Sequence, residues 1–295
     1  MQAMRGAWPL NTWPENFISA RLNSDVSLEC RTDREDIIWK KGGLGIAERS
    51  PRILSFTRVD QPDAGNYTCW SGDQIVSSVY LFISEQDGPS GISCNAASYL
   101  DTRLKCTWTH SLMRAPHKIR AKAERGHSDV TPWVDVHMAN DGTVAFQLEL
   151  SDSCLYGEED EPITVRLEAI NDQTYTSENR TLALRDIIKP SCPENVNVLK
   201  LPEGAVQVNW NYPSSWVTPH SYFPLLFHVE QHFHNKSRII IPVEGGNGIT
   251  LTKKVKAVRL KCRDLFYNSE WSDWTKTNSL SDRTTSRQSY PVMGR

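Results

Sequence analysis

The 295-residue sequence lacks the short motifs that mark common catalytic and metal sites. It has no Gly-x-Ser-x-Gly, no His-Glu-x-x-His, no glycine-rich phosphate loop and no sequence-marked carboxylate pair. None of its cysteines forms a Cys-x-x-Cys pair, and its histidines are scattered without zinc spacing. A net charge of -2 provides no basic field for nucleic acid. These absences favour a binding protein without a cofactor over an enzyme.

Long apolar segments are also missing. No run of about 18 apolar residues occurs, which is the length that a membrane-spanning helix needs. The longest apolar stretches, such as residues 79–83, have the length of a strand. Helical periodicity is absent over any long window, whereas short alternating segments recur between turns. With 39% hydrophobic and 9% aromatic residues to fill its cores, the chain is predicted to be all-β.

The first module is expected at residues 17–86. Trp39 follows Cys30 by nine residues, and Tyr67 stands two residues before Cys69. This order is the signature of an immunoglobulin domain, in which a disulfide joins two sheets beside a buried tryptophan. It predicts a Cys30–Cys69 bridge that stabilises the fold by about 4 kcal/mol in the loop-entropy model. The alternative is two free buried cysteines.

Two further β-modules are expected, at residues 87–188 and 189–278. The turn-rich segment 87–91 marks the first boundary. Cys94 and Cys106 are twelve residues apart, which suits a disulfide between adjacent strands joined by a turn. Trp108 shares parity with Cys106 and is therefore expected on the core side. Residues 279–295 are polar without an apolar pattern, which predicts a disordered tail.

The seven cysteines leave at least one without an internal partner. Cys192 and Cys262 share parity with apolar neighbours, so both are expected to face the core of the third module. We predict that they bridge each other, although sequence does not fix connectivity. Cys154 lies in a polar, acidic segment, where a leftover thiol of a secreted protein suggests a bond to another chain. A free or capped thiol is the alternative.

Three N-glycosylation sequons begin at Asn66, Asn179 and Asn235. Together with the cysteines they favour a secreted protein in an oxidising compartment. The first 20 residues lack the apolar core of a secretory signal. We therefore expect a sequence that begins after its leader or is incomplete at its start, unless the compartment assignment is wrong.

Trp271-Ser272-Asp273-Trp274 is the most informative tetrapeptide of the chain. Two tryptophans three residues apart share a face of a strand only where the backbone bulges or twists. In the preceding strand, Arg259, Lys261 and Arg263 alternate with apolar residues. The indole rings are predicted to insert between these cations, each contact contributing about 0.5–1 kcal/mol. Two unrelated aromatic residues near a chain end are the alternative.

These motifs resemble a known family. The disulfide pair with Cys106-Thr107-Trp108, followed by Trp271–Trp274, resembles the class I cytokine-receptor homology region, which consists of two fibronectin type III modules. Segments 185–190 and 212–223 resemble the β subunits of the interleukin-12 family. The resemblance covers residues 20–278. It implies an immunoglobulin-like domain followed by two fibronectin type III-like β-sandwiches.

The resemblance also implies a function. In this family a receptor-like chain is half of a secreted heterodimeric cytokine and binds a four-helix-bundle α subunit, of interleukin-12 α or interleukin-23 α type, at the elbow between its fibronectin modules. Cys154 takes the place of the interchain cysteine. An arginine of the α subunit enters a pocket of acidic and aromatic side chains, and a cell-surface cytokine receptor binds the immunoglobulin domain. The matching pocket positions are Tyr99, Glu158, Tyr222, Asp264, Phe266 and Tyr267.

The chain departs from the family pattern at several places. The middle module lacks the partner cysteine of a second disulfide, Thr275 replaces the serine that usually closes the tryptophan motif, and Phe266 replaces a tyrosine. The basic run that binds heparin in relatives is reduced here, which argues against heparin binding. Its remaining residues are His232, His234, Lys236 and Arg238.

Two binding functions remain as alternatives. A soluble receptor that captures a helical cytokine reversibly needs the same modules but no lasting bond. A homodimer linked through Cys154 is also compatible with the sequence.

Overall fold

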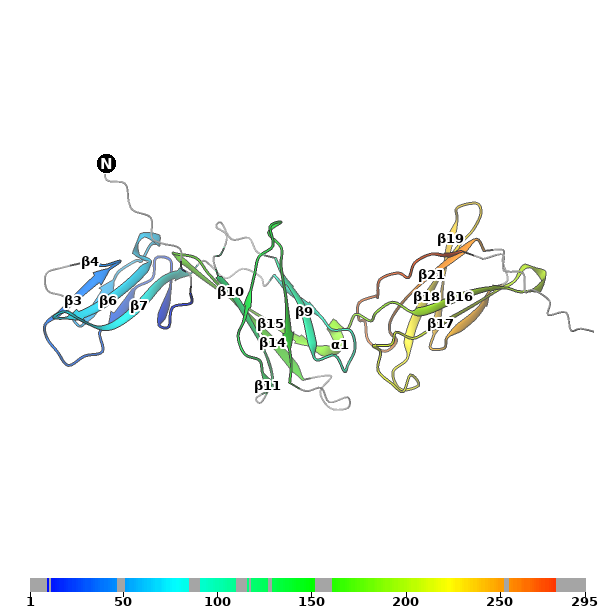
Figure 1. Cartoon of the computed structure of the whole chain (residues 1–295), viewed down its shortest axis with the longest axis horizontal. Coiled ribbons are helices and arrows are strands. Elements are labelled where there is room, and N and C mark those ends of the chain that lie inside the picture. The colour runs from blue at the N-terminus through cyan, green and yellow to red at the C-terminus, as the bar shows by residue number, and fades with distance from the viewer. Residues whose placement is uncertain are drawn as a thin grey trace, which may run out of the picture. The chain divides into compact units, whose positions relative to one another are not determined.

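The computed structural model of the chain describes residues 10, 12–46, 51–84, 91–109, 116, 118–126, 129–151, 161–251 and 255–279. It is built almost entirely of β-strands, as predicted (Figure 1). The described residues fall into two compact units. Unit 1 contains residues 10–94, 102–151 and 161–182, and unit 2 contains Asn95–Asp101 and residues 183–279.

Several strands of unit 1, such as β9 (Arg103–Trp108) and β10 (Lys118–Arg125), alternate between buried and more exposed positions, as half-buried strands do. Its elements before residue 85 are β1 (Phe17–Arg21), β2 (Val26–Glu29), β3 (Ile37–Lys41), β4 (Leu44–Gly45), β5 (Ile53–Phe56), a 3-10 turn (Gln61–Asp63), β6 (Gly65–Ser71) and β7 (Gln74–Ser84). The later strands are β8 (Ile92–Asn95), β9 (Arg103–Trp108), β10 (Lys118–Arg125), β11 (Asp129–Val130), β12 (Val134–Val136), β13 (Val144–Glu149), β14 (Pro162–Ile170) and β15 (Thr174–Ala183).

Ten strands of unit 1 form one sheet, in the order β11-β10-β14-β15-β7-β6-β3-β4, with β1 on β7 and β12 on β10. The sheet is continuous because β7 pairs with β15 in parallel, with Ile83 opposite Thr174. Aromatic side chains reinforce this junction, since Phe82, Tyr80 and Tyr175 form one buried cluster. The strands of the immunoglobulin-like and first fibronectin-like sandwiches therefore share a sheet.

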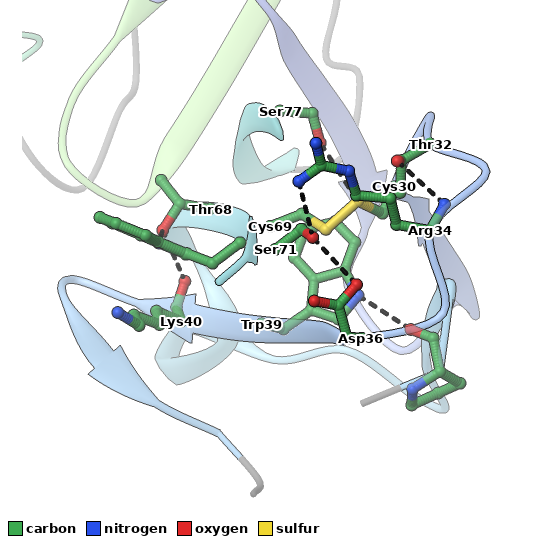
Figure 2. The surroundings of a disulfide bond; sticks show 12 residues. Cys30, Thr32, Arg34, Asp36, Trp39, Lys40, Thr68, Cys69, Ser71 and Ser77 are labelled. Carbon is green, nitrogen blue, oxygen red and sulfur yellow. Dashed lines mark hydrogen bonds between the residues drawn. A yellow bond between two sulfur atoms is a disulfide. The ribbon is translucent and has the colours of Figure 1, made fainter. Parts of the chain in front are cut away.

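A disulfide and a tryptophan form the centre of the immunoglobulin-like sandwich (Figure 2). The Cys30–Cys69 bond is present, as predicted, and joins the end of β2 to β6. Trp39 is fully buried beside it, and its indole N–H donates to the carbonyl of Pro51 at 3.1 Å. The Tyr67 hydroxyl donates to the carbonyl of Asp63 at 2.6 Å, which ties β6 to the preceding turn.

The second sheet of the fibronectin-like part has the order β13-β9-β8. The predicted Cys94–Cys106 disulfide joins β8 to β9. Trp108 is buried on the core side, as its parity predicts, and its indole N–H donates to Glu178 of β15 at 2.9 Å. The carboxylate of Glu178 also accepts from the backbone of Gly91, so it holds both sheets together.

Unit 2 is a sandwich of two sheets, β16-β17-β20 and β19-β18-β21-β22. Trp210 and Phe227 meet between the sheets, with ring centroids 5.2 Å apart. Its elements are α1 (Leu184–Ile187), β16 (Glu194–Lys200), a 3-10 turn (Pro202–Gly204), β17 (Val206–Asn211), β18 (Leu225–His232), β19 (Arg238–Glu244), β20 (Gly248–Leu251), β21 (Ala257–Asp264) and β22 (Asn278–Ser279).

The predicted bridge between Cys192 and Cys262 is wrong for this structure, because both residues are free thiols. The alternation along its strand correctly placed Cys262 in the core, where it is fully buried. Alternation does not determine which atoms the sulfur contacts. The Cys262 thiol donates to the carbonyl of Ser191 at 3.4 Å. Burial raises its pKa to about 12, which keeps the thiol protonated and unreactive.

Two other predictions concern residues that the structure does not describe. Cys154 and Glu158 are among them, as are residues 280–295 of the expected tail. Ser279, which the prediction assigned to that tail, belongs to β22 and pairs with Ala257.

Candidate functional site

The predicted stack of tryptophans and cations is present on one face of β21. Lys261 Nζ lies 4.4 Å from the ring centroid of Trp271 and 4.9 Å from that of Trp274. The Arg263 guanidinium covers Trp271 at 4.8 Å, and that of Arg259 covers Trp274 at 4.4 Å. Cations and rings therefore alternate along the strand, which is the arrangement that cation–π attraction favours.

Hydroxyl side chains allow tryptophans three residues apart to share this face. Ser272 Oγ accepts a hydrogen bond from the backbone of Cys262 at 2.9 Å, and Thr275 Oγ1 accepts one from Leu260 at 3.0 Å. The backbone N–H groups of Ser272 and Thr275 donate back to the same two residues. Ser272 and Thr275 are three residues apart, yet they bond to Cys262 and Leu260, which are two residues apart on β21. Thr275 fills the role of the serine that it replaces.

Strand β18 lies beside β21 and contributes the remaining groups of the stack. His228 is opposite Lys261 in the register, and its ring is 3.9 Å from that of Trp271. Burial lowers the pKa of His228, and Lys261 and Arg263 lower it further. Glu230 receives the guanidinium of Arg259, and this hydrogen bond lowers the pKa of the carboxyl. The stack is therefore braced by ring contacts and by one ion pair, and it keeps the positive charge of Lys261 and Arg263.

Five of the six predicted pocket residues lie in the described part of unit 2, and we call them the aromatic cluster: Tyr99, Tyr222, Asp264, Phe266 and Tyr267. Tyr99 and Asp264 are each only 2% exposed, and the Tyr99 hydroxyl donates to Asp264 Oδ2 at 3.1 Å. Asp264 Oδ1 accepts from the backbone of Phe266 at 2.8 Å and of Tyr267 at 3.0 Å. A buried carboxylate thus shapes the loop that follows β21.

Two members of the aromatic cluster point their rings into solvent. Tyr222 is 60% exposed and Phe266 is 69% exposed, so both present aromatic surface that is available to a partner. Tyr267 is half-buried, and the guanidinium of Arg185 lies 5.5 Å from its ring centroid. The cluster therefore combines exposed aromatic faces with a buried acidic group.

The loop that carries Tyr222 is held by ring contacts at several points. The indole N–H of Trp216 donates to the carbonyl of Phe223 at 2.9 Å. Tyr99 packs against both rings, and His220 stacks on Tyr212 with centroids 3.9 Å apart. These contacts restrict the conformation of the loop that exposes Tyr222.

Comparison with curated proteins identifies the family of this chain. An interleukin-12 subunit beta from Marmota monax is 30% identical over 279 residues, which cover 84% of each chain. That from Ovis aries is 30% identical over 284 residues, and that from Cervus elaphus is 29% identical over 282 residues, with 86% of each chain covered in both cases. The chain belongs to the interleukin-12 subunit beta family. No family model matches the sequence.

Membership in the interleukin-12 subunit beta family makes the chain a cytokine subunit. Its described residues contain no group of three or more metal-ligating side chains. Among the same residues, no helix is long and apolar enough to cross a membrane.

A second stack of tryptophans and cations, in unit 1, was missed in the sequence. The Arg120 guanidinium lies between two indole rings, 3.9 Å from the centroid of Trp13 and 4.3 Å from that of Trp133. It also donates twice to the buried carboxylate of Glu168, at 2.6 and 2.8 Å. The alternation of Arg120 and Lys122 on one face of β10 was an available signal, but neither tryptophan is close to it in sequence.

The three predicted glycosylation sites lie on the surface. The side chains of Asn66, Asn179 and Asn235 are exposed, on β6, on β15 and in the turn between β18 and β19. At Asn235 the side-chain oxygen accepts hydrogen bonds from both the hydroxyl and the backbone of Ser237. Exposure is compatible with an attached glycan at each of these positions.

Proposed function

We propose that this interleukin-12 subunit beta homologue is a secreted, receptor-like chain that binds and disulfide-links a four-helix-bundle α subunit. The heterodimer is a cytokine that signals through cell-surface cytokine receptors, one of which contacts the immunoglobulin-like domain. The proposed docking site for the α subunit is the aromatic cluster of unit 2.

One observation carries this proposal: two large aromatic side chains are exposed on loops that hydrogen bonds and ring contacts hold in place. Exposed Phe266 follows Asp264, whose carboxylate accepts the backbone N–H groups of the loop. Exposed Tyr222 precedes Phe223, which packs on Tyr99. Rigid aromatic anchors are the usual centre of a protein interface, because little conformational entropy is lost on binding.

The chemistry of the cluster suits an arginine of the partner. A guanidinium stacks on aromatic faces and pairs with a carboxylate in a planar fork. Asp264 accepts three hydrogen bonds within the chain, and a carboxylate has about four acceptor positions. One acceptor position therefore remains, but Asp264 is only 2% exposed, so an arginine of the α subunit reaches it only if the surrounding side chains move aside.

The proposed covalent link is made by Cys154, with Glu158 nearby in the sequence. Its test is non-reducing gel electrophoresis of the chain co-expressed with candidate interleukin-12 α and interleukin-23 α chains. The wild type should give a covalent heterodimer, Cys154→Ser should lose it, and the matched control Cys192→Ser should keep it. A covalent band that persists in the Cys154→Ser variant would place the link elsewhere.

The gel also distinguishes the alternatives. A soluble receptor that captures its cytokine reversibly gives no covalent band with any α chain, although the proteins co-purify. A homodimer through Cys154 gives a covalent band of twice the chain mass without an α chain. The absence of both binding and a covalent band would contradict the proposed function.

A further inference from the structure

Arg263 belongs to the tryptophan stack and to the loop of the aromatic cluster at the same time. Its guanidinium covers Trp271 with a Cζ–centroid distance of 4.8 Å. Its Nη1 donates to Asn268 Oδ1 at 2.7 Å. Asn268 lies two residues after Phe266, in the segment between β21 and the tryptophan motif. One side chain therefore connects a stacked, braced surface to the loop that exposes Phe266.

We propose that Arg263 is a positioning residue for α-subunit binding, an inference that rests on the proposed function. Arg263 uses the tryptophan stack as a fixed support and holds residues 265–270 in the shape that presents Phe266. The stack thereby contributes to recognition without contacting the partner.

Two further groups contact Trp271 and help to fix this support. Lys261 and His228 occupy the positions beside this indole, at 4.4 and 3.9 Å. The Nε of Arg263 is buried without a hydrogen-bond partner among the described residues. An unpaired buried donor is costly, so the contacts with Trp271 and Asn268 must offset this cost to keep the guanidinium in place.

The last residue of β21, Asp264, also holds the loop. Asp264 accepts from the backbone of Phe266 and Tyr267, and its own N–H donates to Ser269 Oγ at 3.1 Å. These contacts hold Phe266, Tyr267 and Ser269, and the Arg263–Asn268 bond holds the residue between Tyr267 and Ser269. Loss of one contact lowers the fraction of molecules with a binding-competent loop, and the apparent dissociation constant rises by the inverse of that fraction.

Asn268→Ala tests the proposal, because it removes the acceptor and leaves Arg263 and Trp271 unchanged. The probe is whichever candidate interleukin-12 α or interleukin-23 α chain binds the wild type, titrated against the purified chain. We expect the affinity to fall about three- to tenfold, as for the loss of one hydrogen bond that orders a loop. The amides of Phe266 and Tyr267 should exchange hydrogen faster, which a general loss of stability would not confine to this loop.

Two further variants make the test specific. Asn268→Asp keeps an acceptor for Arg263 and should restore wild-type affinity. Asn278→Ala makes the same change on β22, where the side chain donates to the carbonyl of Lys276 at 2.9 Å, and should bind like the wild type. The role of Arg263 is refuted if Asn268→Ala binds like the wild type, or if Asn268→Asp fails to rescue it.

Phe266→Ala separates this inference from the proposed function. If Phe266→Ala weakens binding and Asn268→Ala does not, the docking site stands and the positioning role of Arg263 is wrong. If neither Phe266→Ala nor Tyr222→Ala alters the affinity, the aromatic cluster is not the docking site, and both proposals fail.

Discussion

At the scale of single residues, two hydroxyl groups determine how the tryptophan motif fits its neighbouring strand. Ser272 and Thr275 use their side-chain oxygens as acceptors where a regular strand would use carbonyls. The sequence indicated that the backbone must depart from a plain strand between Trp271 and Trp274. It did not indicate that side chains replace backbone acceptors, because spacing reports which face a residue occupies and not which atom it bonds.

A substitution at Thr275 tests this role. Thr275→Val keeps the shape of the side chain but removes the acceptor of the Leu260 N–H. We expect the free energy of unfolding to fall by about 1–3 kcal/mol, the cost of an unsatisfied partly buried donor. Urea denaturation measures this change, with Thr275→Ser as the control that keeps the oxygen. A Val variant as stable as the wild type would show that water replaces the hydroxyl.

At the scale of elements, alternation along β21 predicted the stack correctly. Leu260 and Cys262 face the core, whereas Arg259, Lys261 and Arg263 are only partly buried and contact the indole rings. The participation of His228 was not predicted, because strand register between β18 and β21 is not visible in either segment alone. The same limit applies to β7 and β15, whose pairing makes one sheet from strands of two modules.

His228 makes the stack sensitive to acid. An unfolded imidazole has a pKa of about 6.5, and burial together with Lys261 and Arg263 lowers the pKa in the folded chain. Below pH 6.5 the unfolded state therefore binds a proton that the folded state resists. The stabilisation is complete above this pH and is lost as the pH falls from there toward the folded pKa.

We expect the free energy of unfolding to fall more steeply between pH 7.5 and pH 5.5 in the wild type than in His228→Phe, which keeps a ring beside Trp271. Urea denaturation at the two pH values measures the difference. Equal slopes in both proteins would mean that His228 does not contribute to the pH dependence.

At the scale of the whole molecule, much of the architecture was predictable because it depends on local signals. Cysteine spacing predicted the disulfides Cys30–Cys69, with Trp39 and Tyr67 as further signals, and Cys94–Cys106, and both are present. The Cys192–Cys262 prediction was wrong, because parity does not determine pairing. The contact between Tyr99 and Asp264, 165 residues apart, follows from the fold and is not visible in any local pattern.

The candidate docking site depends on such long-range contacts. Its residues were selected from a family resemblance, and the structure places five of them in one unit. Their division into a buried pair and exposed rings is not visible in the sequence, since the exposure of Phe266 and Tyr222 depends on how two loops pack.

The central claim is that the aromatic cluster docks a helical α subunit. Its most direct test is the dissociation constant for an interleukin-12 α or interleukin-23 α chain, measured for Tyr222→Ala and Phe266→Ala. The control is Ile240→Ala, which removes a 46% exposed side chain from β19 of the same unit. Interface anchors contribute about 2 kcal/mol or more, or about 30-fold in affinity. The account predicts such a loss for at least one cluster variant and wild-type binding for Ile240→Ala; wild-type affinity in both cluster variants would contradict it.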